Sequence, residues 1–297
     1  RGREGLRIDE AIDFISTNGN STFYLNLWLY ATHLPIRPPP EILQNFPQIT
    51  VDQSLFGNMQ AEFDIVEADG ASVSEMMRIY LAEVYALDLQ VGRLLDHLEA
   101  VGLADTTIVI FSSDNGPEQV ESNRLEVLGY AGGLRGRKST FYEGGTRVPF
   151  LVRWPGHIPA GRVDETSIMF GLDMLPTICS LAQVPFQVEL VEGEDMSDVW
   201  LGESRSRTYP LFFRQFRNQN KGYMRYGKWK LLKDEKELYD LESDPYELNN
   251  VYALNLDVVA ELTKSFESWE AGLPNGHARL PDDPLPFDPT VPVQEIV

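Results

Sequence analysis

A long helical pattern that leads directly into a short apolar run constrains the fold of this chain more than any other feature. Residues 74–101 repeat apolar side chains at the spacing of an amphipathic helix, and Gly102 follows as a C-cap. Residues 108–111 are continuously apolar and mostly β-branched, which is typical of a strand buried on both faces of a parallel sheet. A helix followed by such a strand predicts an α/β fold.

Composition limits the class of protein. The chain has 297 residues, of which 43% are hydrophobic, and this is enough for a full core. Its formal net charge of −20 argues against nucleic acid and anionic lipid as partners, because both require clustered cations. No apolar run is long enough to span a membrane. The oligomeric state stays open.

Further elements are expected on both sides of the helix–strand unit. Residues 7–15 predict a helix, residues 23–31 a buried strand, residues 148–154 another strand and residues 173–183 a helix. Residues 45–72 are interpreted as irregular and polar.

The pattern of residue types in the sequence changes after about residue 205. Short aromatic-rich segments predict a small antiparallel sheet, and a helical pattern follows that can cover it. The expected strands are residues 209–213, 222–225, 229–232 and 237–241, and the expected helix is residues 257–269. We predict a main domain over residues 1–205, a small α+β subdomain over 206–270 and a proline-rich tail over 271–297.

Asp114 and Asn115 stand directly after the predicted strand at 108–113. The carboxyl end of a strand is where ligands bind in open α/β sheets. A carboxylate and an amide carbonyl are hard oxygen donors that suit Ca²⁺ or Mg²⁺. The alternative is an Asx turn that closes the strand together with Gly116 and Pro117.

Two further residues carry potential chemistry. His33 lies in a loop after an apolar segment, where it is either an ordinary loop residue or an acid or charge partner at the same sheet edge. Lys138 lies among other cations beside Gly144-Gly145, and such clustering suits an oxyanion site. The alternative is a solvated basic loop. The other cations are Arg135, Arg137 and Arg147.

The single cysteine, Cys179, excludes an internal disulfide and any cysteine-based metal cluster. It lies in a helical pattern, and we interpret it as a core residue. Asn20-Ser21-Thr22 is a lone glycosylation sequon, which offers weak support for a secretory route.

Taken together, the motifs carry a resemblance. The chain resembles the C-terminal part of a type I sulfatase, of the arylsulfatase family within the alkaline phosphatase superfamily. The similar stretches follow the family's order from about residue 5 to 270. They are "FYLNLWLYATHLP", "TIVIFSSDNGP", "LRGRKSTFYEGGTRVPFLVRWPGHIPAG", "DMLPTICSLAQV", "YGKWKLL" and "ELYDLESDPYELNNV".

The resemblance implies a role for each candidate residue. Asp114 and Asn115 match the family's second pair of Ca²⁺ ligands. His33 matches the active-site histidine, and Lys138 matches the lysine that contacts the sulfate and the leaving-group oxygen. Residues 143–147 match the signature turn after that lysine. The implied fold is an alkaline-phosphatase-like sandwich, a central and mostly parallel sheet flanked by helices, without its N-terminal half.

The implied activity is hydrolysis of a sulfate monoester on a sulfated small molecule or glycan. One Ca²⁺ ion and a formylglycine would take part, but the C/S-x-P-x-R motif that yields formylglycine is absent from this sequence. We therefore expect the N-terminal half to supply that residue and the remaining ligands, and the isolated chain to be inactive and poorly soluble. The usual location of enzymes of this family implies that the protein is secreted, periplasmic or lysosomal.

Some points stay open at the sequence level. A phosphodiesterase or phosphonate hydrolase of the same superfamily is an alternative, as is a non-catalytic sulfatase-like remnant. Arg137 occupies a position where the family often has a small residue, and it either points to solvent or helps to bind an anionic substrate. The particular sulfate ester is not defined by these residues.

Overall fold

The computed structural model of the protein describes residues 2–187, 191–215 and 221–273. The described residues form two compact units, one within residues 2–155 and one within residues 156–273. The domain boundaries predicted at 205/206 and 270/271 stay predictions. Most of the predicted tail lies outside the described residues.

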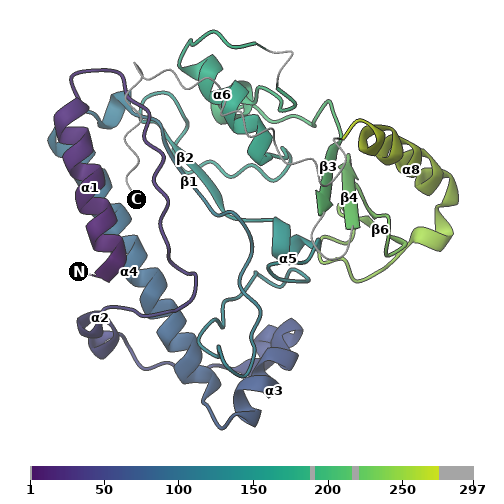
Figure 1. The fold of residues 1–297 in the computed structure, drawn as a ribbon, viewed down its shortest axis with the longest axis horizontal. Helices are drawn as coiled ribbons and strands as arrows, with labels where there is room; N and C mark the ends of the chain where they lie inside the picture. The colour runs from purple at the N-terminus through teal and green to yellow at the C-terminus, as the bar shows by residue number, and fades with distance from the viewer. Residues whose placement is uncertain (1, 188–190, 216–220, 274–297) are drawn as a thin grey trace, which may run out of the picture. The chain divides into compact units, whose positions relative to one another are not determined.

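Two helices form one side of the first unit. Helix α1 (Gly2–Asn18) runs alongside α4 (Val73–Ala100) in Figure 1. One stripe of α1 is fully buried, and a hydrogen bond between Ser16 Oγ and His97 Nε2 (3.0 Å) ties the two helices together. The buried stripe consists of Ile8, Ala11 and Ile15. Both helices predicted from apolar spacing are therefore confirmed.

The ends of α4 follow from local chemistry. Ser72 Oγ accepts a hydrogen bond from the Glu75 backbone N–H (3.3 Å), which satisfies one of the unpaired donors of the first turn. At the other end Gly102 adopts a φ of +74°, a left-handed conformation that glycine reaches at little cost. The chain then turns toward the next strand.

A short strand pair follows. Strand β1 (Val109–Ser112) pairs antiparallel with β2 (Phe150–Arg153), with Ile110 opposite Val152. Both strands were predicted, but parallel pairing was expected for β1, and its partner within the described residues runs antiparallel. β1 is less buried than expected, because Phe111 and Ser112 are exposed and β2 is its only strand partner within the described residues.

Residues 23–30 form no strand, although a buried one was predicted there. Exposure alternates strictly along this segment, with Tyr24 and Trp28 exposed and Phe23 and Leu25 half-buried. That alternation is the period of an extended chain. The segment lacks a ladder because residues 23–29 make no backbone hydrogen bond within the part of the chain that the structure describes.

The expectation that residues 45–72 are irregular is wrong. They follow the short helix α2 (Pro40–Asn45) and contain a 3₁₀ helix (Gln53–Met59) and α3 (Gln60–Ala68). The stretch is rich in acidic residues, but Phe63 and Val66 are spaced so that both are buried on one side of α3.

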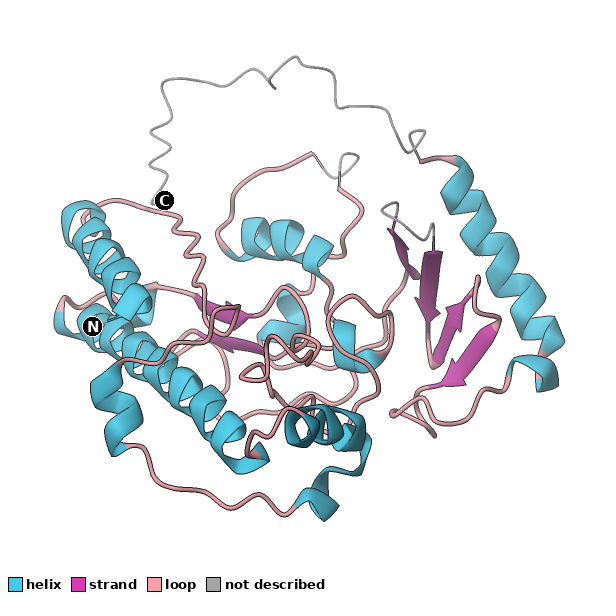
Figure 2. Cartoon of the chain, turned by 60° about the horizontal axis from the view of Figure 1, so that its bottom comes forward, coloured by secondary structure: helices cyan, strands magenta, loops and turns pink. Residues whose placement is uncertain are grey.

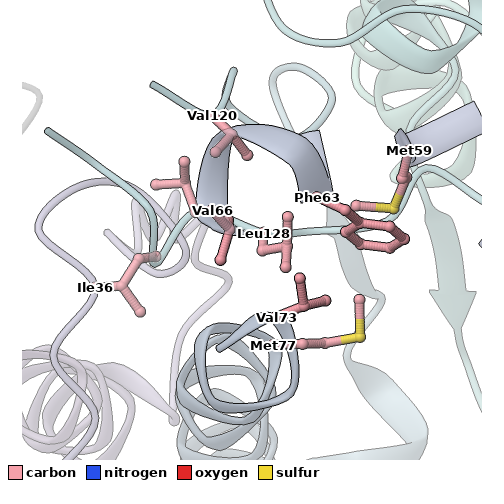
Figure 3. Close-up of a cluster of buried hydrophobic side chains, with 9 residues drawn as sticks. Ile36, Met59, Phe63, Val66, Val73, Met77, Val120 and Leu128 are labelled. Atoms are coloured by element: carbon pink, nitrogen blue, oxygen red, sulfur yellow. The ribbon is translucent and has the colours of Figure 1, made fainter. Parts of the chain in front are cut away.

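The core of the first unit brings distant segments together (Figure 3). Ile36 follows the His33 loop by three residues, and Val120 follows Asn115 by five. Both belong to one buried cluster with Val66 of α3 and Val73 of α4. This core therefore anchors both loops that carry candidate site residues.

The second unit contains the predicted antiparallel sheet, whose strand order is β3-β4-β5-β6. Figure 2 shows helix α8 (Leu256–Ala271) alongside these strands. The strands are β3 (Leu211–Gln215), β4 (Lys221–Tyr226), β5 (Trp229–Leu232) and β6 (Glu237–Asp240). Leu231 of β5 and Phe266 of α8 belong to one buried cluster, so the predicted sheet with a covering helix is confirmed.

The rest of the second unit is organised around a buried carboxylate. Asp173 precedes α6 (Met174–Leu181) and accepts hydrogen bonds from the backbone N–H groups of Glu194 (2.8 Å) and Phe170 (2.7 Å). Arg207 forms an ion pair with the same carboxylate. Helix α7 (Ser197–Trp200) follows shortly after Glu194.

Candidate active site

A glycine-dependent contact between two backbone segments forms the base of the candidate site. The Gly116 N–H donates to the Gly145 carbonyl (3.0 Å), and the Gly144 N–H donates to the Arg135 carbonyl (2.7 Å). A Cβ on Gly116 would lie 1.9 Å from the Gly144 oxygen. Only glycine allows this approach, so these glycines bring the loop after β1 against the turn that contains Lys138.

Lys138 is attached directly to the loop after β1. Its N–H donates to the Pro117 carbonyl (2.9 Å), and its Nζ lies 3.1 Å from Glu118 Oε2. The next residue, Ser139, has a φ of +70°, and the chain turns back there toward α5 (Glu143–Thr146). The structure therefore brings Lys138 to the segment that carries Asp114 and Asn115.

Asp114 is exposed and Asn115 is half-exposed. The Asx-turn interpretation fails, because the Gly116 N–H donates to Gly145 rather than to the Asp114 side chain. Within the described residues the Asp114 carboxylate makes no hydrogen bond or ion pair. The neighbouring Ser113 Oγ donates to the Asn115 carbonyl (2.9 Å) and not to this carboxylate. The Asp114 carboxylate therefore remains available to a ligand.

His33 is held in a tight loop. Its N–H donates to the Tyr30 carbonyl (2.8 Å), and its Nδ1–H donates to the Leu34 carbonyl (2.9 Å). The ring also contacts Tyr30 edge-on at 5.1 Å between centroids. With Nδ1 occupied, Nε2 is the ring atom that remains for a ligand.

The Tyr80 side chain of α4 contacts the His33 loop and borders Gly129. Thr32 Oγ1 lies 2.8 Å from the Tyr80 hydroxyl. A Cβ on Gly129 would lie 2.7 Å from that hydroxyl and 3.0 Å from Pro117 Cβ, so Tyr80 and Pro117 both border Gly129. Among the described residues no hydrogen bond or ion pair joins His33 directly to Asp114, Asn115 or Lys138.

Arg137 has a partner that the sequence did not reveal. Its guanidinium is buried, with Nε 2.7 Å from Glu62 Oε1 on α3 and Nη1 3.0 Å from the Glu118 carbonyl. Arg137 therefore does not point to solvent, and its guanidinium is held by Glu62 and by the Glu118 carbonyl. Glu62 lies far away in the sequence, and no local pattern predicts the pair.

Glu118 is the other residue that sequence reasoning missed. Burial acts to raise the pKa of its carboxyl, but hydrogen bonds from the Gln119 N–H and from Lys138 lower it, and the pKa lies below its usual value. The sequence signal that could have identified Glu118 is its position directly after Asp114-Asn115-Gly116-Pro117, beside the candidate metal ligands.

Cys179 is a half-buried free thiol on α6, so its packing is looser than a core position implies. No group of three or more histidine, cysteine or acidic side chains in the described part of the chain could hold a metal by itself. Asp114 and Asn115 fit a hard cation chemically but would share it with further ligands.

Comparisons with known proteins identify the class. A family model described as Sulfatase matches residues 6–184, and one described as N-sulphoglucosamine sulphohydrolase, C-terminal, matches residues 136–271. The first match covers more than half of the chain, and it contains every candidate site residue. The chain belongs to the sulfatase family.

Similar curated proteins support this assignment. Human arylsulfatase A is 42% identical over 127 residues, which is 43% of this chain and 24% of that protein. N-acetylgalactosamine-6-O-sulfatase of Bacteroides thetaiotaomicron is 29% identical over 62% of this chain and 40% of its own length. Arylsulfatase of Clostridium perfringens is 26% identical over 94% of this chain and 60% of its own length. The chain thus spans only part of each relative.

Solved structures show the same fold. Ps i-CgsB in complex with k-i-k-neocarrahexaose matches 90% of this chain and 54% of its own, with a TM-score of 0.73 and 25% identity. BT4656 in complex with its substrate D-Glucosamine-2-N, 6-O-disulfate matches 90% of this chain and 69% of its own, with a TM-score of 0.66 and 20% identity. The predicted alkaline-phosphatase-like α/β fold class is confirmed.

Proposed function

We propose that the protein containing this chain hydrolyses a sulfate monoester, and that this chain supplies His33, Asp114, Asn115 and Lys138 to the site. The observation that carries the proposal is the glycine contact that attaches the Lys138 turn to the Asp114 loop. This contact holds the Lys138 turn against the loop that carries Asp114, and it supports a site that binds both a metal and a sulfate group.

Lys138 and His33 have distinct roles in this proposal. The Lys138 ammonium is a compact point charge that stabilises negative charge on the sulfate and on the leaving oxygen. His33, oriented through its Nδ1–H, presents Nε2 to the leaving oxygen, and in its doubly protonated form it donates the Nε2 proton to that oxygen, which departs as the alcohol. Both residues act at the leaving group.

Asp114 and Asn115 would hold a Ca²⁺ ion together with ligands from a part of the protein outside this chain. The ion supplies charge neutralisation for the sulfate oxygens. Asp114 supports this role because it is exposed and its carboxylate makes no hydrogen bond or ion pair within the described residues. The formylglycine that the family resemblance implies would also come from outside this chain, so the isolated chain is inactive.

The substrate proposed is a sulfated small molecule or a sulfated glycan. Similarity to arylsulfatase A supports the first class. Similarity to an N-acetylgalactosamine-6-O-sulfatase, and to a solved structure in complex with neocarrahexaose, supports the second. The proposed location is secreted, periplasmic or lysosomal. Asn20 of the sequon is exposed in a turn after α1, which is compatible with a secretory route. No described helix is both long enough and apolar enough to cross a bilayer.

Replacement of Lys138 by alanine in the full-length protein tests the proposal. Turnover of an aryl sulfate should fall by about 10²–10³, the scale seen when one oxyanion donor is lost. Lys264→Ala is the matched control, since Lys264 is exposed on α8 in the other unit.

Unchanged turnover in Lys138→Ala would remove this lysine from the reaction. Turnover of a phosphate diester but not of any sulfate ester would instead support the phosphodiesterase alternative. If neither ester is turned over, the non-catalytic alternative holds.

A further inference from the structure

A partly buried ion pair joins Glu118 to Lys138. Nζ lies 3.1 Å from Oε2, and the two side chains are 26% and 19% exposed, respectively. Two more contacts hold the same segments together, because the Lys138 N–H donates to Pro117 (2.9 Å) and Gln119 Nε2 donates to the Lys138 carbonyl (3.4 Å). Glu118 is therefore fixed on both sides against the lysine turn.

Arg137 fixes the backbone of the same glutamate. Its Nη1 donates to the Glu118 carbonyl (3.0 Å), while Nε pairs with Glu62 (2.7 Å). Adjacent cations thus bind the two ends of one residue, since Arg137 holds the carbonyl and Lys138 holds the carboxylate. Arg137 is buried, whereas the Lys138 ammonium remains partly exposed toward solvent.

The charges around this pair favour an ionised glutamate. Hydrogen bonds from Gln119 and Lys138 outweigh burial and hold the pKa of Glu118 below its usual value, and Arg124 adds in the same direction. The other charged groups nearby are Glu62, Arg137 and Glu121, of which Glu121 is paired with Arg124. At neutral pH Glu118 is therefore an anionic partner for Lys138.

We propose that Glu118 is a positioning residue for Lys138, holding its ammonium in place before the sulfate group arrives. The inference rests on the proposed function of Lys138. A lysine has a long flexible stem, so an ion pair that orders it in the free protein reduces the ordering required when substrate binds. Glu118 itself need not touch the substrate, because it acts through the lysine.

A double-mutant cycle on the full-length protein measures this role. Glu118→Gln alone should lower kcat/KM for an aryl sulfate by about tenfold, within the range of couplings between contacting residues. In a Lys138→Met background, Glu118→Gln should cause no further loss. A merely structural glutamate would cost the same factor in both backgrounds, and that result would overturn the proposal.

A conservative variant tests whether the charge of Glu118 is what matters. Glu118→Asp keeps the charge on a shorter stem, so it should recover part of the activity that Glu118→Gln loses. Glu121→Gln is the matched control, because Glu121 lies on the same loop and pairs with Arg124 rather than with Lys138. Equal losses in all three variants would contradict a specific role for Glu118.

A second measurement does not depend on sulfatase activity. The rate at which a limiting amine-acylating reagent modifies Lys138, followed by peptide mass spectrometry, should rise at least about threefold in Glu118→Gln because the ion pair is lost. It should not change in Glu121→Gln. If no ester is turned over, the proposed function fails while this rate still reports the pair. An unchanged rate in Glu118→Gln would overturn the positioning role.

Discussion

At the scale of single residues, neighbouring cations of the same turn have opposite environments. Arg137 is buried and paired with Glu62, whereas Lys138 is partly exposed and paired with Glu118. The sequence indicated a possible anion site at Lys138, because a lysine beside a glycine pair has recognisable chemistry. It could not assign Arg137, because that depends on a residue of α3 distant in the sequence.

A buried carboxylate at the start of the chain holds the loop that leads to His33. Glu4 is almost fully buried, and Oε1 and Oε2 lie 3.2 Å from the Tyr30 backbone nitrogen, with Oε1 3.1 Å from that of Ala31. These charge-assisted bonds fix the backbone just before the histidine.

Glu4→Gln keeps an acceptor oxygen but removes the charge. We expect the free energy of unfolding of the full-length protein to fall by about 1–2 kcal/mol, the difference between charged and neutral hydrogen bonds. Urea denaturation measures the loss, and amide hydrogen exchange should accelerate at Tyr30 and Ala31. Glu10→Gln, an exposed position on the same helix, should leave both unchanged. Exchange that stays slow in Glu4→Gln would show that other contacts hold this loop.

At the scale of elements, the glycine turn before β2 is a close backbone contact. A Cβ on Gly144 would lie 2.2 Å from the Gly136 oxygen and 2.6 Å from the Arg135 oxygen. Both neighbours are backbone atoms and cannot move aside as a flexible side chain can. The site therefore depends on a residue type that has no functional group.

Gly144→Ala should destabilise the full-length protein by about 1–3 kcal/mol, the usual cost of overpacking, and should reduce sulfate-ester turnover because the Lys138 turn shifts. Gly92→Ala is the control. Gly92 lies within α4 and has nothing within 4 Å of its added Cβ, so this change should stabilise by about 0.5–1 kcal/mol. Thermal unfolding compares the two. Equal melting temperatures would mean that the turn can relax around a methyl group.

The elements that sequence predicted well are those with a period of their own. The apolar spacing of α4, the Gly102 turn at its end and the apolar run of β1 are local signals, and the structure confirms them. The segment at 23–30 has the alternation of an extended chain, but its residues 23–29 make no described backbone hydrogen bond, and pairing is not a local property. Helix α3 was missed because its acidic residues hid the spacing of Phe63 and Val66.

At the scale of the whole molecule, the sequence proposes candidate site residues but does not predict the contact that brings their loops together. Asp114 and Lys138 were proposed separately and then joined by a family resemblance, whereas the physical reason for their proximity is the contact of Gly116 with Gly144 and Gly145. Each glycine was visible in the sequence, but a contact between two loops of different origin becomes visible only in three dimensions.

The chain also presents apolar side chains that a folded enzyme normally covers. Tyr24 is 70% exposed, Trp28 is 82% exposed and Leu151 of β2 is 58% exposed. The first two lie on the extended segment whose backbone makes no described hydrogen bonds at residues 23–29. An unpaired, apolar, extended segment is a template for association.

A polypeptide of residues 1–297 alone should therefore associate with itself, bind a hydrophobic dye and hydrolyse no sulfate ester. The full-length protein should neither associate with itself nor bind the dye. Light scattering and dye fluorescence measure the difference. Tyr24→Ser combined with Trp28→Ser should reduce the association of the isolated chain, because it removes the exposed aromatic side chains at the unpaired segment while leaving the buried core unchanged. A monomeric isolated chain that unfolds cooperatively and binds no dye would show that residues 23–30 need no partner strand.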